Sequence, residues 1–195
     1  GAFMSMLGIS ILNNVFSIND IENMTAASIL NAMRDNLKQA LHQTKMEGSN
    51  QDSIDIALLI FDMNNMTIQY AGAFRPLWIV RNKTLLEYRG DRMPIGIYIA
   101  EKESFTNHVI KIEHGDRLYL FSDGITDQYG YENGELKKFT AKRLRQFLEK
   151  NHSLPMNVQK IFLDTLIHDW KVSNDIRLPA AQQTDDITVL GIHII

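Results

Sequence analysis

The stretch FSDGITD, residues 121–127, does most to decide the fold, together with TDDITVL at residues 184–190. Each joins a carboxylate to an apolar run of the kind that forms a buried strand. If these runs pair as antiparallel neighbours, the end of the first lies beside the start of the second. We therefore expect Asp123 and Asp185 to converge at one edge of a sheet, where two carboxylates suit Mg²⁺ or Mn²⁺.

Each motif taken alone also has an ordinary structural interpretation. Ser-Asp-Gly is a common turn, because the aspartate side chain bonds its own backbone and glycine accepts a positive φ. An Asp-Asp pair before a strand is commonly a loop or cap feature. Ordered carboxylates beside a core need a partner, and a lysine or arginine would serve as well as a metal ion.

Composition favours a soluble globular protein, with residues 1–195 as one domain, although two domains are not excluded. The chain has no cysteine, which excludes disulfides, zinc-thiolate sites and cysteine nucleophiles. The net charge of −3 gives no support for nucleic-acid binding. No apolar run is long enough for a membrane span, and no signal-peptide pattern is present, so we expect a cytoplasmic protein.

The apolar pattern changes from helix to strand and back to helix. We expect a helix buried all round at residues 1–12, and a second helix that Thr25 caps, with Ile29, Met33 and Leu37 inward and Arg34 outward. Strands are expected at 54–61, 66–70, 77–81, 85–88, 105–112, 118–121 and 187–195. Two more helices are marked by Phe139, Leu144, Phe147 and Leu148, and by Val158, Phe162, Leu166 and Trp170 after Pro155. This order predicts an α+β layered fold.

Several ordered motifs resemble one known family. The segments FSDGITD and TDDITV, with YAGAFRP at residues 70–76 and MPIG at 93–96, are similar to the bacterial metal-dependent serine/threonine phosphatases of the PPM (PP2C-like) class, in the SpoIIE/RsbU branch. The resemblance covers essentially the whole chain. It implies a PP2C-like sandwich of two antiparallel β-sheets flanked by helices.

The resemblance also implies a mechanism and its residues. Family members use two Mn²⁺ or Mg²⁺ ions, whose bridging water attacks a phosphoserine or phosphothreonine. Asp123 and Asp185 would be metal ligands and the catalytic carboxylates. Ser122 and Gly124 would shape the turn that aims Asp123, and Asp186 would lie behind the ligands in a supporting shell. Asp55 falls at a strand position where it could approach the site, but a surface position is the simpler interpretation.

Departures from the family pattern lead to an expectation about activity. The family's Asp-x-x-Gly-His-Gly motif, whose aspartate bridges both ions, would precede Gly1, so we expect an N-terminally partial domain that lacks the first strands. The remaining carboxylates would repel one another. We expect weak or no turnover of p-nitrophenyl phosphate with Mn²⁺ by these 195 residues alone. Ala73-Phe74 also stands where the family usually has His-Asn.

The resemblance suggests partners and leaves alternatives open. A substrate would be a phosphoprotein such as an anti-sigma-factor antagonist, in a partner switch governed by an upstream sensor or receiver domain, and a homodimer through the regulatory helices is a further expectation. One alternative is a non-catalytic module of the same fold that binds a phosphoprotein or partner. A weaker one is a structural domain whose acidic turns bind nothing.

The remaining polar residues are assigned ordinary roles. The histidines lack metal-ligand spacing, and the two tryptophans fit a core better than a binding platform. The basic residues Lys137, Lys138, Lys142, Arg143 and Arg145 are expected on a solvated helix face, with docking of an acidic phosphoprotein as the alternative.

Overall fold

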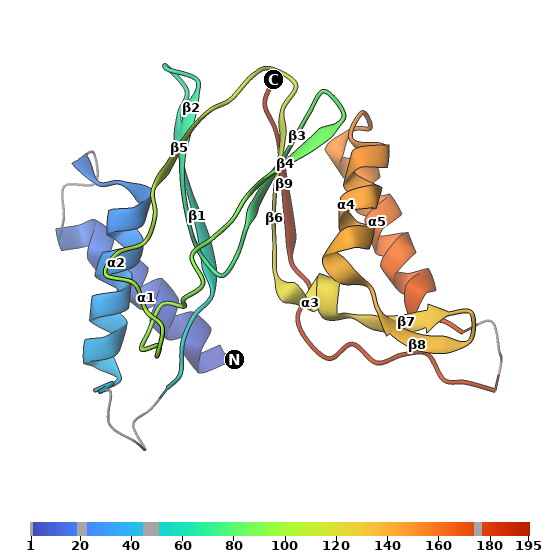
Figure 1. The fold of residues 1–195 in the computed structure, drawn as a ribbon, viewed down its shortest axis with the longest axis horizontal. Helices are drawn as coiled ribbons and strands as arrows, with labels where there is room; N and C mark the ends of the chain where they lie inside the picture. Colours follow the sequence, from blue (N-terminus) through green and yellow to red (C-terminus); the bar gives the residue numbers. More distant parts are fainter. Residues whose placement is uncertain (1, 19–22, 45–50, 174–176) are drawn as a thin grey trace. The chain divides into compact units, whose positions relative to one another are not determined.

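The computed structural model describes residues 2–18, 23–44, 51–173 and 177–195. The chain divides into two compact units, one formed by Gly1–Leu77 with Tyr88–Glu113 and the other by Trp78–Glu87 with His114–Ile195. Each unit combines an antiparallel sheet with helices (Figure 1). The predicted α+β class with antiparallel sheets and flanking helices is confirmed. None of the described helices is long and apolar enough to cross a membrane.

The first unit packs two helices against a three-stranded sheet of order β1-β2-β5, in which both pairings are antiparallel. Alternate residues of the first strand, Ile56, Leu58 and Ile60, face a core built largely from the helices, as expected for period-two side chains. Figure 1 shows both helices on the same side of this sheet. The elements are α1 (Ala2–Ile18), α2 (Ala26–Ala40), β1 (Ile56–Asp62), β2 (Thr67–Ala73) and β5 (His108–Lys111).

Helix α2 begins where the sequence predicted. The Thr25 side chain accepts a hydrogen bond from the Ser28 amide, and the Ser28 side chain accepts one from the Thr25 amide, which completes a capping box. Arg34, expected outward, is 6% exposed. Its guanidinium donates to the carbonyls of Lys102 and Glu103 at 3.0 and 2.7 Å, so it is buried because loop carbonyls receive it.

Helix α1 is not buried all round, so that prediction is wrong. It buries Gly8, Ile11 and Val15 along one stripe. Its other sides and its C-terminal end expose large apolar side chains, which are Phe3, Met6, Ile9 and Ile18. A uniformly apolar segment gives no periodicity from which the buried side could be chosen.

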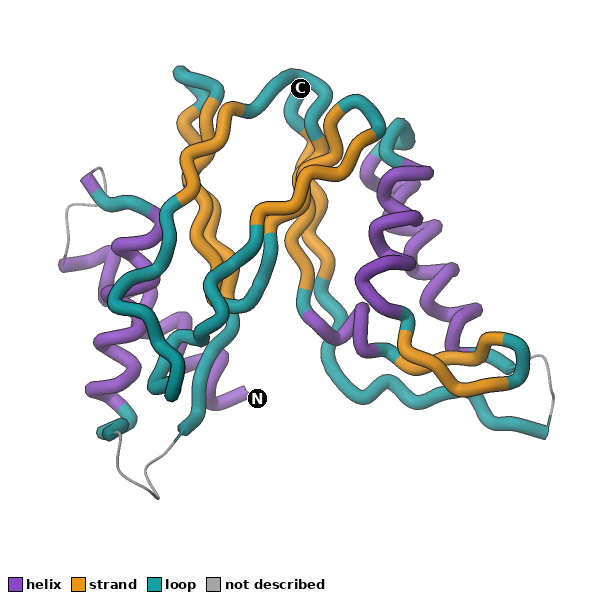
Figure 2. The backbone as a smooth tube through the Cα atoms, in the orientation of Figure 1, coloured by secondary structure: helices purple, strands orange, loops and turns teal. Residues whose placement is uncertain are grey.

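The second unit contains a four-stranded sheet of order β4-β3-β6-β9, a two-stranded hairpin and three helices (Figure 2). Both β3 and β9 are antiparallel to β6. Asn82 and Lys83 join β3 to β4 with φ of 48° and 68°, the conformation of a tight two-residue hairpin. The elements are β3 (Leu77–Arg81), β4 (Thr84–Tyr88), β6 (Arg117–Phe121), α3 (Asp123–Asp127), β7 (Tyr129–Glu132), β8 (Glu135–Lys138), α4 (Thr140–Asn151), α5 (Met156–Lys171) and β9 (Val189–His193).

Three details of this unit differ from the sequence expectations. The β7–β8 hairpin was not anticipated, and β9 is shorter than the expected strand 187–195. Helix α5 buries Gln159, Leu163 and Ile167. Phe162, expected inward, is 48% exposed, so the buried face is rotated by one residue.

The basic residues do not form one solvated helix face. Lys137 and Lys138 lie on β8 and pair with Glu135 and Asp127 respectively. On α4, Arg143 pairs with Glu132 and its guanidinium lies 4.6 Å from the Trp170 ring centroid. Much of the charge that could attract an acidic partner is therefore paired within the chain.

Candidate functional site

The two acidic segments leave the second sheet at the same end. Strands β6 and β9 pair antiparallel up to Phe121 opposite Val189, which meets the condition on which the expected convergence of the two motifs depends. The Ser122 amide then donates to the Thr188 carbonyl at 3.0 Å, which continues the pairing past the strand ends. In Figure 1, α3 and the segment before β9 meet at this end of the sheet.

Ser122 joins the two segments through its side chain. Its hydroxyl donates to the Asp186 carbonyl at 2.9 Å and accepts from the Thr188 amide at 3.0 Å. Ser122 occupies the N-cap position of α3 yet makes no side-chain cap bond to that helix. Its hydrogen-bonding capacity therefore serves the partner segment instead of its own helix.

Gly124 allows the closest approach of the segments. A Cβ atom at this position would lie 2.3 Å from the Asp186 oxygen and 2.9 Å from its carbonyl carbon. Only a residue without a side chain fits there, which explains the glycine immediately after Asp123. Ile125, the next residue, is fully buried in the core of the second unit and anchors α3.

The predicted ligands lie at this junction with different environments. Asp123 begins α3 and is partly buried, whereas Asp185 and Asp186 are exposed. The Asp185 carboxylate accepts from the Asp186 amide at 2.7 Å, and the Gln183 side chain donates to the Asp185 carbonyl at 3.0 Å. The structure therefore brings both acidic segments together through Ser122, Gly124 and Asp186.

A lysine also acts on this cluster. Lys138 pairs with Asp127 at 3.1 Å, and this hydrogen bond, with smaller contributions from the Asp127 and Asp123 charges, raises the pKa of Lys138. The alternative that the sequence left open, a basic side chain near the carboxylates, is thus present beside the candidate site. Sequence reasoning missed it because Lys138 is brought here by the unpredicted hairpin.

The donor chemistry of the predicted ligands fits a hard divalent cation. Carboxylate oxygens at Asp123 and Asp185 are ligands that Mg²⁺ and Mn²⁺ prefer. Among residues 2–18, 23–44, 51–173 and 177–195, no group of three or more acidic, histidine or cysteine side chains is placed to hold a metal ion. Asp55 belongs to the first unit, where it pairs with Arg75 at 2.7 Å.

Ala73 and Phe74, which stand where the family usually has His-Asn, are held by contacts within the first unit. Phe74 is 39% exposed, has φ of +57°, and packs edge-on against Tyr98. Its amide donates to the Asp91 carbonyl. Burial alone would raise the pKa of the Asp91 carboxyl, but hydrogen bonds from Lys102 and Thr106 outweigh it and lower this pKa below its ordinary value.

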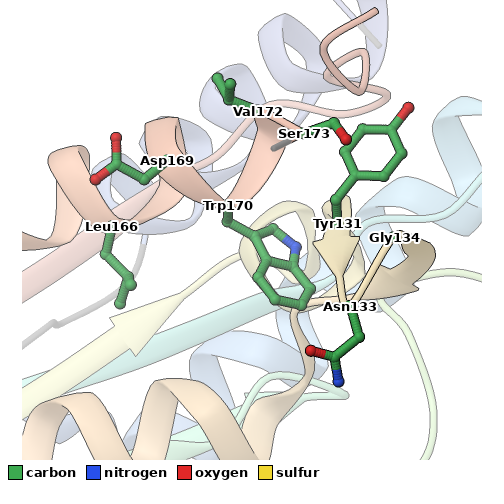
Figure 3. Close-up of a pocket in the computed structure, with 8 residues that line it drawn as sticks. All are labelled: Tyr131, Asn133, Gly134, Leu166, Asp169, Trp170, Val172 and Ser173. Carbon is green, nitrogen blue, oxygen red and sulfur yellow. The ribbon is translucent and has the colours of Figure 1, made fainter. Parts of the chain in front are cut away.

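Two cavities lie along α5, the smaller of them also beside the β7–β8 hairpin, and neither Asp123 nor Asp185 is among their lining residues. Figure 3 shows the smaller one, about 300 Å³, with the Trp170 indole and the Tyr131 ring among its lining groups. The larger, about 730 Å³, lies along α5 and β9 and reaches Gln183 and Ile187. The indole nitrogen of Trp170 donates to the Gln128 carbonyl at 3.2 Å, so this wall of the small cavity is tied to the end of α3.

The fold has close counterparts among solved structures. The chain is similar to the SiaA-PP2C domain of Pseudomonas aeruginosa, with a TM-score of 0.79, 22% identity, and coverage of 98% of this chain and 69% of that one. It is also similar to a structure of the PP2C phosphatase domain and a regulatory-domain fragment of SpoIIE from Bacillus subtilis. That match has a TM-score of 0.66 and 20% identity, and it covers 98% of this chain but only 50% of that chain. A third match is the catalytic domain of the serine/threonine phosphatase PstP in complex with two manganese ions. Its TM-score is 0.58 at 14% identity, and the match covers 97% of this chain and 79% of that chain.

At these identities the structural matches show a PP2C-like fold. The comparison with curated proteins gave no match. The family profile described as Stage II sporulation protein E (SpoIIE) matches residues 2–195, nearly the whole length. With the fold and the two acidic motifs in agreement, the chain belongs to the SpoIIE family of PP2C-like phosphatase domains.

Proposed function

We propose that this chain is a metal-dependent phosphoprotein phosphatase domain acting on phosphoserine or phosphothreonine, with Asp123 and Asp185 as metal ligands. One observation carries the proposal: Ser122 and Gly124 join the two acidic segments at the same sheet end. The family and a fold neighbour that holds two manganese ions support it.

The chain's own residues would hold and orient the ion or ions. Asp123 and Asp185 supply carboxylate oxygens, while Ser122, Gly124 and Asp186 fix the backbone that carries them. A bound Mn²⁺ or Mg²⁺ lowers the pKa of coordinated water and offsets phosphate charge. Because the described carboxylates form only part of a ligand set, we expect weak turnover from the 195 residues alone.

Calorimetric titration with Mn²⁺ tests the proposal, since it does not depend on turnover. Wild-type protein should bind saturably, and Asp123→Asn or Asp185→Asn should weaken binding by tenfold or more. Asp164→Asn is the matched control, because Asp164 is an exposed carboxylate on α5 that pairs with Lys160. Equal affinity in all four proteins, or no binding by the wild type, would overturn the assignment.

A non-catalytic module is the second candidate, favoured by the lack of any three-ligand group among the described residues. Such a protein would bind a phosphoserine peptide without Mn²⁺ and release no phosphate. The phosphatase would release phosphate in a Mn²⁺-dependent manner. Measuring peptide binding and phosphate release on one sample separates the two functions.

The partner proposals follow from the family and are secondary. They comprise a phosphorylated anti-sigma-factor antagonist as substrate, an upstream sensor or receiver domain, a homodimer and a cytoplasmic location. The known neighbours include the RsbU and RsbW domains of a Mycobacterium tuberculosis protein, 17% identical to this chain. Mixing the chain with candidate phosphorylated antagonists and following loss of phosphate by mass spectrometry tests the substrate proposal.

A further inference from the structure

Gln128, immediately after α3, is a buried amide with specific contacts. Its side chain is 1% exposed. The side-chain nitrogen donates to the carbonyl of Tyr129 at 2.8 Å and to the carbonyl of Gln182 at 3.0 Å. Both partners are acceptors, so the NH₂ group must face them and the orientation of the amide is determined.

The backbone of Gln128 is anchored as firmly as its side chain. Its carbonyl accepts from the Phe139 amide at 2.8 Å and from the Trp170 indole at 3.2 Å. Phe139 precedes α4 and is 1% exposed, and Trp170 lies near the end of α5. Gln128 therefore connects the rigid helical part of this unit to the exposed segment that begins at Gln182.

Ser122 and Gln128 flank α3, and both form hydrogen bonds with the segment of residues 182–188. Ser122, before the helix, holds residues 186 and 188, while Gln128, after the helix, holds residue 182. Asp123 lies on α3 and Asp185 on that segment. The backbone on either side of Asp185 is thus hydrogen-bonded to the residues that flank the Asp123 helix.

Stability alone does not account for an amide at this position. The side-chain oxygen of Gln128 is buried and has no hydrogen-bond partner within the described ranges. A buried unpaired acceptor is destabilising and methionine has a similar shape without one, so the two hydrogen bonds that the amide donates are what distinguish glutamine here. The segment it holds is exposed from Gln182 to Asp186 and gains little from burial.

We propose that Gln128 is a positioning residue for the metal site, fixing the Asp185 segment against the Asp123 helix. The inference rests on the proposed function, in which these two carboxylates are ligands. Replacing a residue that orients a metal ligand without binding the metal itself typically weakens metal affinity by about 10–100-fold.

Gln128→Met tests the inference, with Gln159→Met as the matched control. Gln159 is also a buried glutamine, 4% exposed, whose amide donates to the Leu154 carbonyl and accepts from Tyr119. Its hydrogen-bond partners in the described structure are Tyr119, His152 and Leu154, none of which lies within residues 182–188. Gln128→Asn keeps an amide that is one methylene too short to reach both carbonyls, and it replaces the methionine variant if that variant does not fold.

Two measurements are made on each protein: backbone order parameters of residues 182–186 from ¹⁵N relaxation, and Mn²⁺ affinity by calorimetry. Gln128→Met should lower the order parameters from roughly 0.85 toward 0.6, and it should weaken Mn²⁺ binding by about tenfold or more. Gln159→Met should change neither.

The outcomes separate this inference from the proposed function. Unchanged order parameters, or looser residues with unchanged Mn²⁺ affinity, would overturn the positioning role while leaving the phosphatase proposal intact. A wild-type protein that binds no Mn²⁺ would overturn the proposed function and this role with it, even if the segment loosens in the variant.

Discussion

Gly124→Ala should separate the two acidic segments while changing the chain by a single methyl group. The added Cβ would lie 2.3 Å from the Asp186 oxygen and 2.9 Å from its carbonyl carbon, where ordinary contacts begin at 3.4 Å. Both atoms belong to backbone, so no side chain can rotate away. The segment must therefore retreat by about 1 Å, with the two hydrogen bonds of Ser122 stretched at the same time.

The expected cost follows from that overlap. Forcing a methyl group into a packed site costs about 1–3 kcal/mol. For a chain of this size each kcal/mol lowers the melting temperature by about 2–4 °C, so we expect a decrease of about 2–12 °C. Under the proposed function, Gly124→Ala should also weaken Mn²⁺ binding by more than the loss of folding stability alone would, because the displaced residue, Asp186, adjoins Asp185.

Calorimetry provides both readouts: a thermal scan for stability and a Mn²⁺ titration for affinity. Gly191→Ala on β9 is the control, since its added Cβ would contact the flexible Met156 sulfur at 3.2 Å and lies away from the acidic segments. A Gly124→Ala protein with the melting temperature and Mn²⁺ affinity of the wild type would refute the close-approach argument.

Three further predictions concern stability. Asp91→Asn should destabilise the fold at pH 7 and progressively less as the solution is acidified. Burial raises the pKa of Asp91, but hydrogen bonds from Lys102 and Thr106 outweigh it and lower this pKa below 3.8. The stabilisation is therefore present above about pH 4 and is lost as pH falls through the folded pKa, which urea unfolding over a series of pH values would detect. Arg81→Ala should lower the free energy of unfolding in urea by about 3–5 kcal/mol. The reason is that Asp116 is 1% exposed and accepts two hydrogen bonds from Arg81, which the variant removes. A loss below about 1 kcal/mol would contradict this. Thr25→Ala should cost about 1 kcal/mol through loss of the capping box, measured by thermal unfolding, and an unchanged transition would count against the cap.

Where a pattern in the sequence had one physical meaning, the expectation was confirmed. Thr25 caps α2, and the strands around residues 54–61 and 66–70 pair as a hairpin. The antiparallel pairing of β6 with β9, the condition on which the expected meeting of the two acidic motifs depended, is present. In each case a polar group stands at the edge of an apolar run, which marks both the element and its end.

The misses share a different cause, namely dependence on distant contacts. Arg34 is buried because the loop carbonyls of residues 102 and 103 accept hydrogen bonds from its guanidinium. The periodicity of a helical sequence cannot indicate a contact with a loop that is distant along the chain. The β7–β8 hairpin carries charged residues whose cross-strand pairing offsets weak strand propensity, as in Lys137 of β8 with Glu132 of β7. Gln128 has no local signal either, since its importance depends on the Gln182 carbonyl far along the chain.

The contacts that join the acidic segments have one chemical property in common, which is that they are neutral. A serine hydroxyl, a glycine that permits contact and a glutamine amide hold the backbone, rather than ion pairs with the carboxylates. Two like charges held near one another repel, and a cation relieves that repulsion. Under the proposed function, a site built this way would present its negative charge to a divalent ion from a backbone that neutral hydrogen bonds hold in place.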